Sequence, residues 1–225
     1  MLNLLTAKER MAGVVLSYSP VTKTTTVFKI PTYPSFGLVF GRSGNGKPAL
    51  LQLIAGLSSQ NQAPSINNDQ SPELLLPGRV GIVFQFPERY FVADNVLDEI
   101  IFGWPRQRGG VQLRELLASR LERAMTSVGL TGISLDKDPQ SLSGGYKRRL
   151  ALAIYLVQIP ALLILDEPLA GLDWKASADV VKLLKKLKKE LTLLLVSHDL
   201  EELASLVDRS WRMETGVLKS ELLPI

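Results

Sequence analysis

The chain has 225 residues and a formal charge of +4; 46% of its residues are hydrophobic and 21% are charged. This composition fits one globular domain with a sizeable core, and so small and diffuse a charge gives no reason to expect a nucleic-acid partner. The lack of cysteine excludes disulfides, cysteine zinc sites and thiol nucleophiles, and a single histidine excludes a histidine-rich metal site.

The sequence contains no apolar run approaching the roughly 20 residues needed to span a bilayer. If the protein moves something across a membrane, we therefore expect another chain to supply the channel. The first ten residues lack the form of a secretory signal, because Glu9 closely follows a short apolar stretch. They also make a poor organellar transit peptide.

Short apolar strands alternate with helices along the chain, which predicts an α/β fold on a mostly parallel sheet. The expected order is a strand at 37–40, a helix at 49–57, a loop or weak hairpin at 58–78, a strand at 80–84, helices at 95–102, 113–128 and 143–157, a strand at 162–165, a lysine-rich amphipathic helix at 176–191 and a strand at 193–196. The helical middle predicts a lobe of its own. One domain would then comprise a core of about 13–88 and 158–225 and a helical subdomain of about 89–157.

Residues 41–47 fit the pattern G-x-x-x-x-G-K of a phosphate-binding loop, between an expected strand and an expected helix. The glycines let backbone N–H groups close around a phosphate chain, and the helix N-terminus favours negative charge. A plain glycine turn is the alternative. We expect a nucleotide to contact the following residues: Gly41, Arg42, Ser43, Gly44, Asn45, Gly46, Lys47, Pro48 and Ala49.

Pro48 departs from the phosphate-loop pattern, which places serine or threonine after the lysine to hold Mg²⁺. Proline brings no hydroxyl for the metal and no N–H for a phosphate, although the first turn of a helix tolerates it. It should also bias Lys47 away from helical geometry. We therefore predict weak binding of Mg²⁺-nucleotide and slow hydrolysis. A sequence error or an unusual allele is the alternative explanation of Pro48.

The segment Leu142, Ser143, Gly144 and Gly145 matches the LSGG signature of ABC ATPases, and nearly the whole chain resembles that family. A Gly-Gly pair at a helix start exposes N–H groups to an anion, although alone it could be an ordinary helix start capped by Ser143. In the family the signature of one cassette covers the ATP held by another. The resemblance thus implies a P-loop NTPase fold with a helical signature subdomain, ATP and Mg²⁺ as ligands, and a dimer of cassettes.

The resemblance assigns roles to further residues. Asp166 and Glu167 end an apolar strand like the Walker B motif, which implies that Asp166 holds Mg²⁺ and Glu167 orients the attacking water. Asp173 matches the D-loop at the dimer seam, and His198 matches the switch histidine at the γ-phosphate.

The resemblance also assigns roles to two residues at the edges of the nucleotide site, Gln85 and Tyr18. Gln85 resembles the Q-loop glutamine, which senses Mg²⁺ and the water. Tyr18 stands where the family places an aromatic residue that stacks on adenine, and a core or surface tyrosine is the alternative.

Within the family, residues 80–88 and 96–103 resemble the ATPases of energy-coupling-factor importers, which take up vitamins or transition-metal ions. Residues 104–106, 146–149 and 171–175 resemble plant plastid members of the soluble ABC subfamily I. This implies a plastid cassette, peripheral to a membrane and joined to a separate transmembrane coupling subunit. One alternative is a soluble scaffold or regulator, for example in metallocofactor assembly. A DNA-repair type ATPase ranks last, because the stretch from Lys47 to Leu142 is too short for a long coiled coil.

Overall fold

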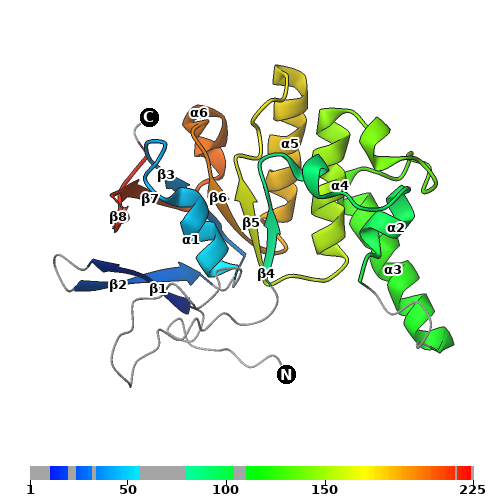
Figure 1. Ribbon diagram of the computed structural model, residues 1–225, viewed down its shortest axis with the longest axis horizontal. Coiled ribbons are helices and arrows are strands. Elements are labelled where there is room, and N and C mark those ends of the chain that lie inside the picture. The colour runs from blue at the N-terminus through cyan, green and yellow to red at the C-terminus, as the bar shows by residue number, and fades with distance from the viewer. Residues whose placement is uncertain are drawn as a thin grey trace.

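The computed structural model describes residues 11–19, 24–31, 34–55, 80–103, 110–215 and 217–223, the first two segments as backbone (Figure 1). The strands are β1 (Met11–Ser19), β2 (Thr24–Pro31), β3 (Phe36–Phe40), β4 (Val80–Val83), β5 (Leu162–Asp166), β6 (Thr192–Val196), β7 (Arg209–Glu214) and β8 (Val217–Ser220). The helices are α1 (Lys47–Ile54), α2 (Val96–Ile100), α3 (Val111–Val128), α4 (Gly144–Leu156), α5 (Trp174–Leu187) and α6 (Leu200–Leu203). None of these helices is long and apolar enough to cross a bilayer.

The main sheet has the strand order β4-β5-β6-β3-β7-β8 and is parallel except for β8, which pairs antiparallel with β7. Side chains of a strand point alternately to the two faces of its sheet. In β6, Leu193 and Leu195 accordingly join the core under α3, α4 and α5, whereas Leu194 and Val196 join the core under α1. The predicted α/β fold, with helices on both faces of a mostly parallel sheet, is confirmed.

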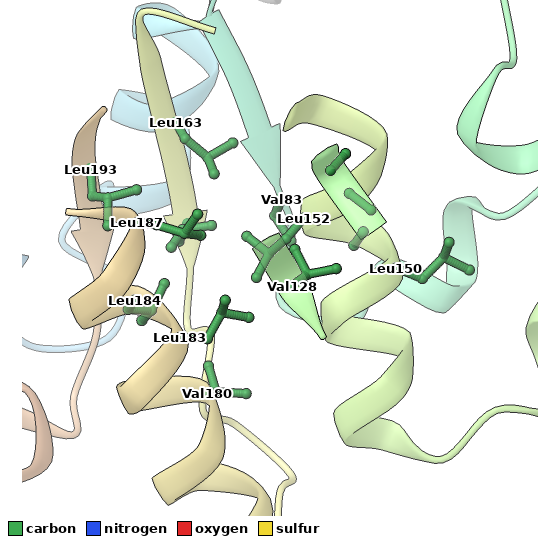
Figure 2. Close-up of a cluster of buried hydrophobic side chains, with 14 of the residues drawn as sticks. Val83, Val128, Leu150, Leu152, Leu163, Val180, Leu183, Leu184, Leu187 and Leu193 are labelled. Atoms are coloured by element: carbon green, nitrogen blue, oxygen red, sulfur yellow. The ribbon is translucent and has the colours of Figure 1, made fainter. Parts of the chain in front are cut away.

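Helix α5 shows how the larger core is built (Figure 2). Its carboxylate cap is Asp173, whose side chain accepts a hydrogen bond from the Ala176 N–H at 2.8 Å. Figure 2 shows a stripe of its side chains directed toward β5, β6 and α4, and these side chains are Val180, Leu183, Leu184 and Leu187. Most lysines of this helix lie on the exposed face, as expected of a solvated surface. Lys188, directly after the helix, differs because it is half-buried and pairs with Asp208.

Several predicted boundaries shift, and the loop or weak hairpin predicted at 58–78 lies outside the described residues. Helix α5 begins two residues before the expected position and ends four before it, and α1 begins at Lys47 rather than Ala49. Strands β7 and β8 and the antiparallel pair β1–β2 were not predicted. In Figure 1 the β1–β2 pair lies beside β8, at the end of the main sheet away from β4.

Helices α2, α3 and α4 gather at the β4 end of the sheet (Figure 1). Helix α3 ends at Gly129, which adopts a left-handed conformation with φ of 71°. Buried side chains of α3 and α4 share one core with β5 and β6. The helical region therefore packs directly on the sheet. Its predicted bounds as a subdomain, about 89–157, remain a prediction.

Candidate nucleotide-binding site

The predicted site residues gather at the carboxyl edge of the parallel sheet. The register pairs Val39 of β3 with Val196 of β6, and Leu165 of β5 with Leu195 of β6. Segments that follow these strands therefore meet at one edge, where open α/β sheets bind ligands. The segments contribute the phosphate loop after β3, Gln85 after β4, Asp166 and Glu167 at the end of β5, and His198 after β6.

The phosphate loop depends on three glycines with positive φ: 146° at Gly41, 83° at Gly44 and 90° at Gly46. A Cβ atom on Gly41 would lie 2.4 Å from the carbonyl oxygen of Met213 in β7. The same carbonyl accepts a hydrogen bond of 2.7 Å from the Asn45 side chain. A Cβ atom on Gly44 would meet nothing within 4 Å. The loop thus backs onto β7 and opens outward at Gly44.

Lys47 lies inside the loop and is only 4% exposed. Its ammonium group donates to the carbonyl oxygens of Gly41 at 2.7 Å and Arg42 at 3.1 Å. Burial lowers the pKa of Lys47, and the carboxylates of Glu167 and Asp166 oppose this effect. A buried ammonium group beside loop carbonyls is placed to exchange those partners for an anion.

Helix α1 begins at Lys47, so the expectation that Pro48 biases Lys47 away from helical geometry is wrong. The Leu50 N–H donates to the Gly46 carbonyl at 3.0 Å, which closes the first turn around the proline. The first N–H groups of a helix have no intrahelical acceptor, so proline at the second position removes no helical hydrogen bond. Pro48 is exposed and presents an apolar ring where a hydroxyl is expected.

Glu167 is held in place by the segment after β6. One carboxylate oxygen accepts from the Ser197 hydroxyl and the His198 N–H, both at 3.1 Å, and the other lies 3.2 Å from the imidazole Nε2 of His198. Its backbone has φ of 44°, which is uncommon for a residue with a side chain. Such conformations concentrate at functional sites, and here it directs a nearly buried carboxylate toward the sheet edge.

Asp166 is a half-buried neighbour of Glu167. Burial raises the pKa of Asp166 and the Glu167 charge adds to this, whereas Lys47, Arg148 and His198 act in the opposite direction. Gln85 is half-buried, two residues beyond β4, the strand next to β5. Among the described residues no three acidic, histidine or cysteine side chains form a metal cluster. A cation at Asp166 would therefore take ligands from bound nucleotide and water as well.

The signature residues lie at the start of α4. Leu142 is buried, whereas Ser143 and Gly144 are exposed. Ser143 occupies the N-cap position but its side chain makes no capping hydrogen bond, so the ordinary-cap alternative is not what the structure shows. A Cβ atom on Gly144 would lie 3.3 Å from Leu172, which places the signature beside the segment that carries Asp173.

An open cavity of about 720 Å³ adjoins the phosphate loop. Its described lining includes Gly41, Arg42 and Asn45 of the loop together with Ser197 and His198, and none of residues 142–145. His198 thus lies at the cavity beside the loop and contacts Glu167, which does not itself line the cavity, and the signature lies apart from it. The Tyr18 side chain lies outside the described residues, and its proposed contact with adenine remains a prediction.

Sequence reasoning missed three contributors to this site, namely Ser197, Arg148 and Met213. Ser197 is fully buried and donates to Glu167, and its place between a buried strand and His198 was the available signal. Arg148 is buried in α4 and donates to carbonyls in two site loops. Met213 acts through its carbonyl oxygen, which no sequence pattern reveals.

A glycine-rich loop between a central strand and a helix, with two carboxylates at the end of another strand of the same sheet, defines a P-loop nucleotide-binding protein. A family model for ABC transporters matches residues 28–170. The chain is 68% identical over 200 residues to ABC transporter I family member 11, chloroplastic, from Arabidopsis thaliana, covering 85% of this chain and 72% of that protein. This chain therefore belongs to the ABC transporter family.

Other relatives are consistent with this family membership. Energy-coupling factor transporter ATP-binding protein EcfA2 from Clostridium acetobutylicum is 38% identical over 187 residues, covering 79% of this chain and 64% of that protein. The chain thus spans about two-thirds of the length of such relatives. The solved structure of cbiO1 from Clostridium perfringens, part of the ABC transporter complex cbiONQ, matches with a TM-score of 0.75 at 26% identity, covering 93% of this chain and 86% of that one.

Proposed function

We propose that this chain is the ATP-binding and ATP-hydrolysing subunit of an energy-coupling-factor type ABC transporter. The observation that carries the proposal is the placement of Glu167. Its carboxylate is fixed by Ser197 and His198 at the same sheet edge as the phosphate loop, where a water attacking a bound γ-phosphate would need it.

The phosphate loop fits a triphosphate chain. Its glycines leave space over Gly44, its amides precede the helix α1, and Lys47 offers a buried ammonium group. Lys47 would exchange the carbonyls of Gly41 and Arg42 for β- and γ-phosphate oxygens, Glu167 would orient and polarise the water, and His198 would contact the γ-phosphate. Negative charge that develops on the transferring group is thereby met from several sides.

The fit to Mg²⁺ is incomplete. Asp166 and Gln85 offer oxygen ligands of the kind that Mg²⁺ prefers, but Pro48 has no hydroxyl where one is expected. A bound Mg²⁺ would neutralise charge on the β- and γ-phosphates. We infer that this chain holds the metal with fewer protein ligands and hydrolyses ATP slowly.

We infer that the active form pairs two cassettes. The signature of this chain lies apart from its own phosphate-loop cavity, so a second cassette would bring Ser143, Gly144 and Gly145 over the nucleotide. Asp173 would lie at the seam between the subunits. The missing hydroxyl at Pro48 is compatible with a partner that is a different cassette as well as with a copy of this chain.

The names of the relatives support a proposal for the membrane partner, the location and the cargo. The relatives called energy-coupling factor transporter ATP-binding proteins suggest a separate transmembrane coupling subunit, with this chain peripheral to the membrane. The relative called chloroplastic suggests a plastid location. Transition-metal ions or vitamins are the proposed cargo, and the cargo contacts would lie in other chains.

The test compares wild type with Glu167→Gln. We expect the variant to bind ATP with unchanged affinity and to hydrolyse it roughly 10²–10⁴-fold more slowly, because it lacks the carboxylate that polarises water. Binding is measured with a fluorescent ATP analogue and hydrolysis by phosphate release. Failure of the wild-type chain to bind ATP, alone or with any cassette partner, would refute the proposal. Recovery of a membrane protein on affinity purification from native membranes tests the transport setting.

A further inference from the structure

Arg148 is a buried cation in the signature helix with no role in the proposed hydrolysis of ATP. It lies in α4, five residues after Ser143, and is 5% exposed. Its guanidinium donates to the carbonyl oxygen of Ala170 at 2.9 Å and to that of Phe84 at 3.3 Å. Taking a guanidinium out of water costs free energy, and these two hydrogen bonds offset part of that cost.

Each carbonyl belongs to a loop that carries a proposed site residue. Phe84 directly precedes Gln85. Ala170 closes a turn with Glu167, because its N–H donates to the Glu167 carbonyl oxygen at 3.1 Å. One planar side chain of α4 thus spans the loop after β4 and the loop after β5, and two donors in a rigid fork fix the relative position of both.

The charge of Arg148 also reaches the site. Burial lowers the pKa of this guanidinium, while Glu88 and Asp166 oppose the effect. In return, Arg148 is one of the cations that favour the ionised form of Asp166. This charge accompanies the geometric tie, which consists of the hydrogen bonds to the two loops.

We propose that Arg148 is a positioning residue that ties the signature helix to the loops of Gln85 and Glu167, so that a shift of the helix changes the positions of both loops. This proposal rests on the proposed function, because Gln85 and Glu167 need fixed positions only if they act on bound ATP. A partner's nucleotide that contacts Ser143 at the start of α4 would then be linked to the position of Gln85 and Glu167 in this subunit.

Arg149 supplies a matched control. It is the next residue of α4 and also donates to a carbonyl, that of Val128 at 3.0 Å, and it lies 3.6 Å from Asp179. Its partners belong to α3 and α5 rather than to the site loops. Removing either arginine disturbs the packing of α4, but only the loss of Arg148 releases Phe84 and Ala170.

The experiment compares Arg148→Lys, Arg148→Gln and Arg149→Gln in the full chain, in wild-type and Pro48→Thr backgrounds. Lysine keeps the charge but lacks the planar fork that reaches both carbonyls. We expect both Arg148 variants to lower kcat by roughly tenfold or more, because a small misplacement of site groups has that effect. ATP affinity should stay within about twofold, and Arg149→Gln should change neither quantity by more than about twofold.

Hydrogen exchange gives a readout that needs no activity. Amides in the loops after β4 and β5 should exchange faster in Arg148→Lys than in Arg149→Gln. Equal kcat and equal exchange in these two variants would overturn the proposal, as would a fall in ATP affinity that matches the fall in kcat. Failure of both Arg148 variants to fold beside a folded Arg149→Gln would assign a purely structural role and equally overturn it. If the wild-type chain did not bind ATP, the proposed function would be refuted instead. The hydrogen-exchange comparison would still test whether Arg148 positions the two loops.

Discussion

Pro48 is the residue at which this cassette departs most from a complete phosphate site. It occupies the second position of α1 and is exposed. We predict that Pro48→Thr raises the Mg²⁺-dependent ATPase rate at least roughly tenfold, since removal of mere outer-shell support costs a metal site 10–100-fold. The measurement is phosphate release over a Mg²⁺ titration.

Pro48→Ala separates the two defects of proline, because alanine restores the N–H but not the hydroxyl. The helix already begins at Lys47, so neither variant needs to rebuild the fold. We expect Pro48→Ala to remain close to wild type in its Mg²⁺ requirement. If Pro48→Thr hydrolysed ATP no faster than wild type, the inferred metal defect would be wrong.

The charged carboxylate of Asp166 should lower the free energy of unfolding, although it serves as a proposed metal ligand. Burial, followed by the Glu167 charge, raises the pKa of Asp166 above its ordinary value. Between the ordinary and the raised pKa the folded state binds more protons than the unfolded chain, so the free energy of unfolding falls as pH rises through this window. Above the window the charged carboxylate remains a cost to the folded state.

Asp166→Asn removes this cost. We predict a melting temperature higher by about 2 °C near pH 7.5, a gain that shrinks as pH is lowered toward the folded-state pKa, together with lost hydrolysis. Thermal unfolding across pH measures it. Asp179→Asn is the control, because that side chain is 45% exposed and its surface ion pairs contribute little. A lower melting temperature for Asp166→Asn at neutral pH would contradict the sign.

At the scale of elements, Asp173 serves α5 directly as its N-cap. We predict that Asp173→Ala costs about 1 kcal/mol of folding free energy, which lowers the melting temperature by roughly 2–4 °C. Asp173→Asn preserves the cap and should melt within about 1 °C of wild type. A loss of hydrolysis in the asparagine variant would then support a role of Asp173 at the proposed subunit interface. Equal melting temperatures of all three proteins would show that the N-cap does not stabilise the fold.

The central strands were predictable from sequence because a strand buried on both faces is a continuous apolar run, as at 162–165 and 193–196. Strand β7 escaped prediction because Arg209, Arg212 and Glu214 interrupt its apolar positions, and Arg212 pairs with Glu214 across 3.0 Å. The loop glycines were visible as a motif. The need for Gly41 at the Met213 carbonyl was not, since that contact joins segments far apart in the chain.

At the scale of the whole molecule, the sequence identifies residues with a local pattern and misses those defined by contacts. The phosphate loop, Glu167 and the signature each lie in a recognisable run of residues. Ser197 and Arg148 matter because folding brings Glu167, Phe84 and Ala170 to them. The proposed partner subunit would be a further contact of this kind. We infer it from the absence of the signature residues from the described lining of the phosphate-loop cavity, rather than from either motif alone.

Two inactive variants should therefore rescue each other if copies of the chain form the dimer. Lys47→Ala removes the proposed phosphate contact. Ser143→Asp puts a residue type favoured at N-caps where Ser143 makes no side-chain cap hydrogen bond, and its charge would repel a partner's nucleotide. Each variant alone should be inactive. In an equal mixture half of the dimers pair the two variants and carry one intact composite site, so we predict about a quarter of the wild-type rate. Where wild type hydrolyses ATP unaided, an inactive mixture of folded variants would contradict a dimer of two independent composite sites.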